Sequence, residues 1–488
     1  MENQDKKPNI IAIIGAIVLL VLAVVGLSYA FFSAFIKNGE TDPSIEGTGA
    51  NLSLVYTDGK SVITSSNIMP GWSATKTFTV TNNGEADTYY KLNISNITNE
   101  FVDGGLTFSI ASADGGTSVA EQAVGTTTRT ISPSITIAEG ATHTYTVTAK
   151  YINLNTDQTP DLGKSFSYTI RIEASQKPTF KDIILANNEV KTPITTPGAA
   201  VSTSSEALLA SAEDDYGTSY YFRGAVTNNY VEFANKCWRI VRIGGDNTVK
   251  LILHNDNISN ASNPCSSANN STTAAFVHYD GNIYKSEFNS NYNDNAYVGF
   301  MYGTPGSTTY EATHANTNKS TILTNLETWY NNNLKTYESV IDNNVFCNDK
   351  SLSSGSGYSA NATDYAARER LYTSKIPSLK CNGELSKITS KIGLITADEL
   401  AFAGYAVRGY ITTSYLKENA TGYSWWSLSP AGFYNKSLSY VFRVRSDNDA
   451  IDICNVNVDS SVRPVISLVS SITISGVSGT SEDPYVVK

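Results

Sequence analysis

One uncharged run, residues 8–36, constrains this chain more than any other feature of its sequence. Residues 10–27 are all apolar, alanine or glycine, and residues 28–36 add one tyrosine and three phenylalanines. A helix needs about 20 apolar residues to span a bilayer, and aromatic side chains gather at the membrane boundary. We therefore expect residues 1–36 to form a cytoplasmic stub followed by a transmembrane helix or a signal segment.

The charges around this run predict its orientation. Two lysines, at positions 6 and 7, precede it, whereas one lysine and three acidic residues follow between positions 37 and 46. Because positive residues stay on the cytoplasmic side, the remainder of the chain is expected outside the membrane. Residues 28–30 (Ser-Tyr-Ala) place small residues at the −3 and −1 positions of a signal-peptidase site. Either residues 10–36 remain as a single-pass anchor, or cleavage after Ala30 releases a secreted protein.

The composition beyond the apolar run is poor in charge. Charged residues make up 16% of the chain and the net charge is −10, whereas an average soluble domain has about 25% charged residues. Since no basic cluster can neutralise phosphates, nucleic acid is excluded as a partner. The polar surface must come instead from asparagine, serine, threonine and 29 tyrosines. Such a neutral surface is common in extracellular β proteins.

The five cysteines all lie between residues 237 and 454, and an extracellular location would let disulfides persist there. Cys237 and Cys265 bracket a predicted strand pair and its loop, and Cys347 and Cys381 bracket a polar excursion. We expect the disulfides Cys237–Cys265 and Cys347–Cys381, with the role of Cys454 open; the alternative is several buried free thiols. No CxxC spacing occurs and the four histidines are isolated, so we expect no metal site and no cofactor.

Residues 48–175 have the pattern of an all-β domain. Apolar and polar residues alternate in short runs that turn clusters separate, as in strands with one buried face. The predicted strands cover residues 51–56, 74–81, 89–97, 106–111, 129–137, 142–151 and 165–174. This number of short strands predicts a β-sandwich.

Two connecting segments flank the second domain. Residues 176–205 contain three prolines and end in serine, threonine and alanine, which predicts a semi-extended linker, with one helical turn near 182–186. Residues 472–488 end the chain with a turn and a short tail strand.

The second domain, residues 206–471, has a mixed pattern of helices and strands. A strand–turn–strand signal covers residues 237–253, and residues 255–320 are predicted to be mainly loop. Leucines and a tyrosine at three- and four-residue spacings predict a helix over residues 320–337. A capping box at residues 396–399 predicts the start of another helix, ending near residue 405.

Two motifs in the first domain carry a family resemblance. Ile-Met-Pro-Gly at residues 68–71 is a turn signal, and residues 76–84 form an alternating strand that ends at an Asn-Gly turn. With the N-terminal apolar segment, they resemble the TasA/camelysin family of Gram-positive surface and biofilm-matrix proteins. Camelysin-type members have been called metalloproteases, but the only histidine of this block is His143 and no HExxH motif occurs. Metal-hydrolase activity is therefore not carried over.

Five ordered motifs in the second domain carry another resemblance. They are Cys-Trp-Arg-Ile-Val-Arg at 237–242, Thr-Trp-Tyr-Asn-Asn-Asn-Leu at 328–334, Leu-Ile-Thr-Ala-Asp-Glu at 394–399, Trp-Trp-Ser-Leu-Ser-Pro at 425–430 and Val-Arg-Pro-Val-Ile at 462–466. Together they resemble an uncharacterised bacterial surface domain akin to the C-type-lectin and formylglycine-generating-enzyme fold. The resemblance implies that the first strand of the domain pairs with the strand at residues 463–469.

The two resemblances give the expected fold class. The chain is expected to be multidomain, with an N-terminal transmembrane helix, an all-β sandwich and a mixed α+β C-type-lectin-like domain. Catalytic members of the second fold depend on paired, metal-binding cysteines near the active site. This chain has no closely spaced cysteine pair, so we expect no catalytic residues and no enzymatic activity.

Two tryptophans and an arginine are candidate ligand-binding residues. Trp425 or Trp426 is able to stack on a sugar face, although adjacent strand residues point to opposite faces, so at most one is expected at the surface. The alternative is that both are core residues. Arg463 is a candidate for holding a ligand carboxylate, and its alternative role is to pair with a structural acid such as Asp398 or Glu399.

A tyrosine-rich stretch supplies the remaining candidates, Tyr297 and Tyr302. Their neighbours in the stretch are Tyr279, Tyr284, Tyr292 and Tyr310. Loops rich in tyrosine, asparagine, serine and glycine combine rigid aromatic contacts with adaptable hydrogen bonds. These residues form either a recognition surface or loop packing within their own domain.

Three functions are consistent with these patterns. The leading hypothesis is a bacterial cell-surface or secreted protein that binds a surface glycan or protein ligand, without catalysis, through its lectin-like domain. The second is a biofilm-matrix or fibre subunit that self-associates through the sandwich. The third is an enzyme on the lectin-like fold.

Overall fold

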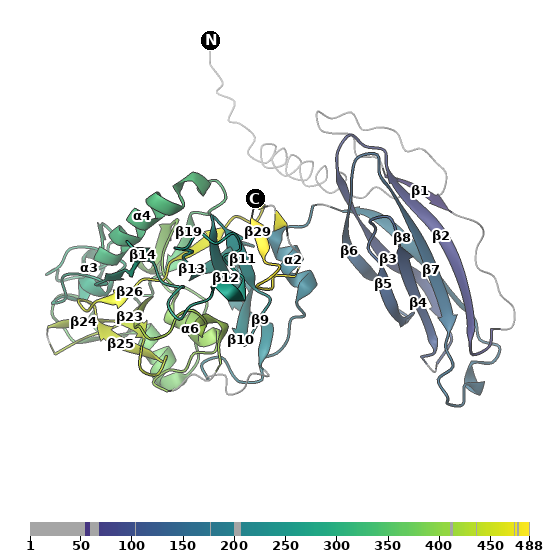
Figure 1. Cartoon of the computed structure of the whole chain (residues 1–488). Coiled ribbons are helices and arrows are strands. Elements are labelled where there is room, and N and C mark those ends of the chain that lie inside the picture. The colour runs from purple at the N-terminus through teal and green to yellow at the C-terminus, as the bar shows by residue number, and fades with distance from the viewer. Residues whose placement is uncertain are drawn as a thin grey trace, which may run out of the picture. The chain divides into compact units, whose positions relative to one another are not determined.

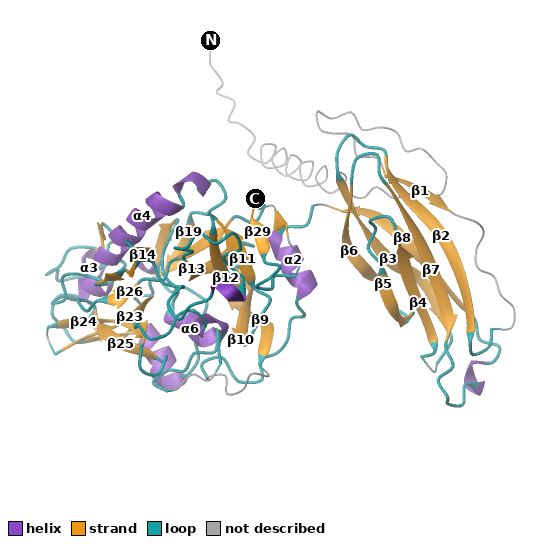
Figure 2. Ribbon diagram, viewed as in Figure 1, coloured by secondary structure: helices purple, strands orange, loops and turns teal. Residues whose placement is uncertain are grey.

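The computed structural model describes residues 54–58, 68–102, 104–175, 177–199, 206–409, 413–435, 437–472, 474–475 and 478–487. The chain forms two compact units, Met1–Pro178 and Thr179–Lys488, and strands dominate both of them (Figures 1 and 2). The predicted membrane segment, residues 10–36, lies outside the described residues. Within the described part, no helix combines the length and the apolar character that a membrane span requires.

The first unit contains two antiparallel sheets. The five-stranded sheet has the order β1 (Leu54–Asp58), β2 (Trp72–Asn82), β7 (Thr142–Tyr151), β4 (Leu106–Ser112) and β5 (Val119–Ala123). The three-stranded sheet has the order β6 (Arg129–Ile137), β3 (Thr88–Asn99) and β8 (Phe166–Ser175).

The two sheets bury one shared core. Phe78 and Val80 lie on the same face of β2 and are buried, as the alternation in the sequence predicts. They pack in one cluster with Leu92 and Ile94 of the other sheet and with Tyr145 of β7. Two sheets that enclose a common core are the arrangement of a β-sandwich.

The segment predicted as a linker differs from a simple spacer. Residues 180–187 form a two-turn helix, α2 (Phe180–Asn187), which Thr179 caps by accepting a hydrogen bond from the Asp182 backbone N–H. Phe180 and Ile184 are fully buried in the core of the second unit. This part of residues 176–205 therefore belongs to the second unit, because its apolar side chains face that core.

The second unit contains two larger sheets. The main path of the first sheet runs β27 (Val465–Leu468), β13 (Val249–Asn255), β12 (Lys236–Ile243), β11 (Tyr230–Phe233), β29 (Tyr485–Val487) and β28 (Ile474–Ser475). Beside this path, β10 (Gly217–Gly224) pairs with both β12 and β9 (Ala207–Asp214). The main path of the second sheet runs β16 (Lys285–Ser286), β26 (Ser460–Ser461), β23 (Trp425–Tyr434), β21 (Thr363–Tyr365) and β20 (Leu352–Gly355). Beside this path, β24 (Leu438–Val444) pairs with β23, and β25 (Ile451–Asn455) pairs with β24.

Short elements complete the second unit. Its helices are α3 (Tyr310–Thr313), α4 (Thr321–Asn333), α5 (Ala366–Arg368), which continues as a π-helix over Glu369–Ser374, and α6 (Ala397–Phe402). Its two-stranded ladders are β14 (His278–Tyr279) with β15 (Asn282–Ile283), β17 (Met301–Tyr302) with β18 (Asn318–Lys319), and β19 (Asn344–Cys347) with β22 (Lys387–Ser390). Ser320 and Thr396 cap α4 and α6, as the sequence predicts.

The pairing that closes the second unit corrects one expectation. Strand β27 pairs with β13, not with the first strand of the domain. The tail strand β29 pairs in parallel with β11, so the C-terminal segment is part of this sheet.

Candidate functional site

Trp425 and Trp426 are fully buried, so the prediction that one of them contacts a ligand at the surface is wrong. They point to opposite sides of β23, as expected, but both sides are covered. The Trp425 ring packs on Tyr405 with centroids 6.3 Å apart, and the Trp426 ring packs on Phe288 at 5.8 Å. The Trp426 Nε1–H also donates to the Ser286 carbonyl oxygen at 2.7 Å.

Arg463 is also fully buried and cannot hold a surface ligand. Its guanidinium donates to the carbonyl oxygens of Leu253 at 2.8 Å and Leu416 at 2.6 Å. It does not pair with Asp398 or Glu399, because those acids are engaged by other cations. Arg463 therefore has neither of the two roles that the sequence suggests, and its side chain is part of the buried interior.

Tyr297 and Tyr302 pack against each other, with ring centroids 5.4 Å apart. Tyr297 belongs to the buried core and Tyr302 packs partly buried against it. Neither residue lines the two pockets described below. Within the tyrosine-rich stretch, Tyr279 and Tyr292 are the two exposed rings.

Two disulfides join the cysteine pairs that the sequence suggests, Cys237 with Cys265 and Cys347 with Cys381. Cys454 is buried and unpaired, and burial raises the pKa of its thiol. Each disulfide lies beside a pocket: Cys347 and Cys381 line one, and Cys265 lies in the loop that borders the other.

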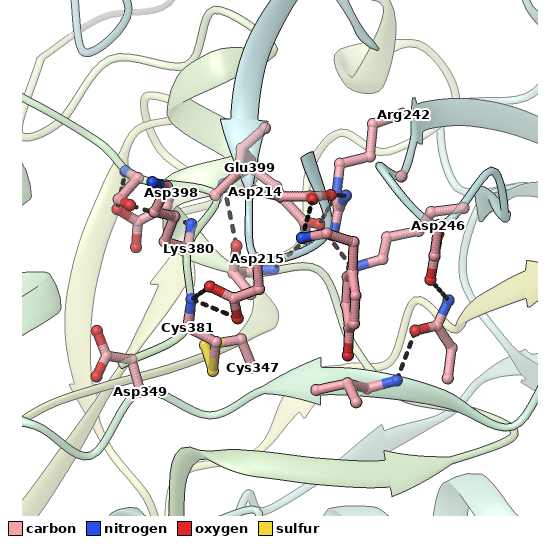
Figure 3. Close-up of a pocket in the computed structure, with 18 of the residues that line it drawn as sticks. Asp214, Asp215, Arg242, Asp246, Cys347, Asp349, Lys380, Cys381, Asp398 and Glu399 are labelled. Carbon is pink, nitrogen blue, oxygen red and sulfur yellow. Dashed lines mark hydrogen bonds and ion pairs between the residues drawn. A yellow bond between two sulfur atoms is a disulfide. The ribbon is translucent and has the colours of Figure 1, made fainter. Parts of the chain in front are cut away.

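The first pocket, here called the charged cavity, has a volume of about 40 Å³ (Figure 3). Strands β9, β12 and β13 contribute its side chains, together with helix α6 and the Cys347–Cys381 disulfide. Its acidic lining residues are Asp214, Asp215, Asp246, Asp349, Asp398 and Glu399, and its basic ones are Arg242, Lys250, Arg370 and Lys380.

Ion pairs within the charged cavity engage several of these charges. Arg242 contacts Asp214 at 2.8 Å and Glu399 at 2.9 Å, and Lys250 contacts Glu399 at 2.6 Å. Burial alone raises the pKa of Glu399, but the charges of Lys250 and Arg242 outweigh it and lower the pKa to about 2. Glu399 is therefore a carboxylate at neutral pH, held between two cations.

Three more acids of the charged cavity, Asp215, Asp349 and Asp398, form a second set of ion pairs and hydrogen bonds. Arg370 bridges Asp349 at 2.7 Å and Asp398 at 2.9 Å, while Asp215 accepts the Cys381 backbone N–H. Across the described residues, no group of three or more histidine, cysteine or acidic side chains is placed to hold a metal ion. The charged cavity is thus a paired network that ties β12, β13, α6 and the second disulfide together.

The second pocket, here called the groove, is more open and has a volume of about 600 Å³. The loop after β13, the segments of β14 to β16 and Tyr423 form its walls. Its lining is rich in amides and hydroxyls, including Asn257, Ser259, Ser271, Thr273, Asn282 and Tyr423.

Internal bonds hold the groove in shape. Asp256 accepts from the Lys236 ammonium at 2.7 Å and from the His278 backbone N–H at 2.9 Å. The Asn255 side-chain amide donates to the Pro264 carbonyl at 3.1 Å. Because Pro264 precedes the disulfide-bonded Cys265, this wall of the groove is fixed covalently and by hydrogen bonds.

Three side chains of the groove suit the recognition of a polar ligand. The Tyr423 ring is about one-third exposed and rests edge-on against Phe276, with centroids 6.2 Å apart. The Lys285 ammonium lies 5.1 Å from the Tyr423 ring centroid. His278 lines the groove; its buried Nδ1 makes no hydrogen bond within the described part of the chain and lies 3.7 Å from the Asp256 carboxylate.

The sequence signals only part of the groove. The sequence predicts recognition by the tyrosine-rich stretch between Tyr279 and Tyr310, and residues 281–283 and 285 of that stretch line the groove, but none of its tyrosines does. Tyr423 lies far along the chain, in front of a buried strand, and no local pattern distinguishes it from the other tyrosines. Its place in the groove depends on tertiary packing.

Comparison of the chain with protein-family models and with curated proteins gave no match in either case.

Proposed function

We propose that this protein is a non-catalytic, extracellular binding protein that recognises a neutral glycan in the groove of its second unit. The observation that carries the proposal is the groove itself, an open polar depression with an aromatic ring, Tyr423, at its wall. Sugars present hydroxyls along their edges and C–H groups on their faces. Amide and hydroxyl side chains can hydrogen-bond the sugar hydroxyls, and an aromatic ring with a polar tip can pack on the C–H face.

The charges of the groove favour a neutral ligand. Its acid, Asp256, is already paired with Lys236 and with the His278 backbone N–H. Lys285 is the basic residue of the lining and lies over Tyr423. One isolated cation does not form the basic cluster that a polyanion requires.

The family resemblances support the same function. A sandwich like that of the TasA/camelysin family would act as a stalk, and a domain like the C-type-lectin and formylglycine-generating-enzyme fold would present the ligand site. The two disulfides support an oxidising, extracellular location. Residues 10–36 would act as the membrane anchor, or would be removed after Ala30.

A glycan array tests this function. The full-length chain, purified in a mild detergent, is expected to bind a subset of neutral oligosaccharides, and free oligosaccharide of the same structure is expected to displace it. Binding that is absent across neutral glycans, or that survives the free competitor, would contradict glycan recognition.

A fibre or matrix role is the second candidate, because the first unit has open strand edges. Among the described strands, β1 and β5 form the edges of one sheet, and β6 and β8 form the edges of the other. Unpaired edge strands offer backbone groups to another copy of the chain. Electron microscopy of the concentrated protein should reveal filaments if this role is correct, and strictly monomeric sedimentation would count against it.

A further inference from the structure

Arg463 carries a buried charge that the surrounding protein leaves incompletely satisfied. Its side chain is fully buried, and two of its N–H groups donate to the Leu253 and Leu416 carbonyl oxygens. Its Nη2 has no hydrogen-bond partner among the described residues. Burial lowers the pKa of Arg463 to about 10, which leaves the guanidinium charged at neutral pH. A buried donor without a partner destabilises the fold, and a charged one does so more strongly.

Three other buried donors beside Arg463 also lack partners. They are Trp425 Nε1, the Tyr405 hydroxyl and the Tyr415 hydroxyl. The guanidinium carbon of Arg463 lies 5.0 Å from the Trp425 ring centroid, and the Tyr405 ring lies perpendicular to the Trp425 ring. Tyr415 immediately precedes Leu416, whose carbonyl oxygen accepts from Arg463, so the four groups lie in one neighbourhood.

The carboxylates around this neighbourhood are taken by other cations. Glu418 contacts Arg239 at 2.8 Å. Asp449 contacts Lys417 at 2.9 Å. Glu399 is held by Arg242 and Lys250. Among the described residues, no carboxylate is therefore paired with Arg463, and its buried charge has only carbonyl oxygens as partners.

We propose that Arg463, Trp425, Tyr405 and Tyr415 bind one small monovalent anion, which is chloride under ordinary extracellular conditions. A halide accepts hydrogen bonds from all four donors at once and neutralises the guanidinium. A water molecule accepts about two hydrogen bonds and leaves the charge uncompensated. The full burial of Arg463 and Trp425 restricts the site to a monatomic ion.

The bound ion acts as a structural cofactor of the second unit. It joins β23, through Trp425, to Arg463 beside β27, to Tyr405 after α6 and to Tyr415 in the 3-10 helix Tyr415–Lys417. None of these four residues lines the groove. A negative result for the anion site therefore leaves the glycan proposal unaffected, and a negative result for glycan binding leaves the anion site unaffected.

Anomalous diffraction from crystals of the full chain grown in sodium bromide tests the site directly. The expected result is a bromide peak in contact with Arg463 Nη2 and Trp425 Nε1. Water density at that position, or continuous protein density with no anomalous peak, overturns the proposal.

Thermal unfolding gives a second readout in solution. At constant ionic strength, replacing gluconate by chloride should raise the Tm of the second unit by about 2 °C for each tenfold rise in chloride above its dissociation constant. In Tyr405→Phe and Tyr415→Phe this chloride dependence should weaken. These variants are preferred to replacement of Arg463, because Arg463 also binds two backbone carbonyls.

Tyr365→Phe is the matched control for these two variants. Its buried hydroxyl already donates to the Asn295 side-chain oxygen at 3.0 Å. This variant should lower the Tm and keep the chloride dependence of the parent protein. A parent protein whose Tm is equal in chloride and gluconate would count against the anion site.

Discussion

Glu399 is a buried carboxylate between Lys250 and Arg242, and its ionisation couples the stability of the second unit to pH. Its pKa is lowered to about 2 in the folded protein, against 4.5 in its unperturbed state. Its contribution to stability is therefore complete above about pH 4.5 and is lost as the pH falls toward 2. The difference corresponds to a contribution on the order of 3 kcal/mol.

The variant Glu399→Gln tests this coupling. It should lower the Tm at pH 7, because the buried Lys250 loses its carboxylate partner and Arg242 keeps only Asp214. It should also flatten the fall in Tm between pH 5 and about pH 2.5. Calorimetry across this pH range measures both effects. Glu384→Gln is the matched control, since Glu384 is exposed and pairs with Lys387 at the surface. An unchanged pH profile in Glu399→Gln would show that the ion pairs do not set acid stability.

Single residues were the hardest features to predict from the sequence. Trp425, Trp426 and Arg463 have side chains that suit both a ligand site and a core, and the choice depends on what covers each face of β23. Neighbours remote in sequence, such as Phe288, provide that cover. The cysteine pairs were predictable because each brackets a separate local excursion of the chain.

Among the elements, the loop after β13 depends most on covalent restraint. The Cys237–Cys265 disulfide closes a loop with a sequence separation of 28 residues, which stabilises the fold by roughly 3–4 kcal/mol in the chain-entropy model. Replacing both cysteines by serine should lower the free energy of unfolding by this amount. The same variant should weaken glycan binding, because this loop forms one wall of the groove.

The second disulfide provides the control for this experiment. The Cys347–Cys381 bond has a sequence separation of 34 residues, so its double serine variant should lose similar stability. It lines the charged cavity and not the groove, so glycan affinity should persist. Denaturant unfolding and titration calorimetry measure the two quantities. Equal losses of affinity in both variants would argue against the groove as the binding site.

Helix α2 tests where the second unit begins. Phe180→Ala removes a fully buried ring, packed on Tyr485 with centroids 5.3 Å apart, and should cost about 3–5 kcal/mol. Calorimetry should show the loss in the unfolding transition of the second unit. Ala186→Ser on the same helix should change stability little, because Ala186 is exposed. If Phe180→Ala leaves that transition unchanged, α2 belongs to a linker after all.

Elements with a regular pattern were predicted well. The seven strands expected in the first unit occur, because alternating runs with one buried face specify their own register. Strand β5 was missed because it buries a single apolar residue, Val119, and lies at a sheet edge. The length of helix α2 was predicted too short, because its apolar residues are buried only by packing into the core of the second unit.

At the scale of the whole molecule, the division into two units follows the change in sequence pattern near Pro178. The proposed ligand site lies within the second unit, and that unit also contains both disulfides and the proposed anion site. The composition of the sequence indicates a long polar loop region after residue 255. It does not indicate that Tyr423 joins that loop, because this contact spans about a third of the chain.

The most direct test of glycan recognition measures the affinity of the full-length protein for a neutral glycan selected on the array. The variants Tyr423→Ala and Tyr216→Ala are compared in this measurement. Both tyrosines are exposed, but Tyr423 lines the groove and Tyr216 lines the charged cavity. Titration calorimetry should show affinity falling about tenfold in Tyr423→Ala, because a stacking surface is lost. It should stay at the parental value in Tyr216→Ala. Parental affinity in Tyr423→Ala, or a loss confined to Tyr216→Ala, would contradict recognition in the groove.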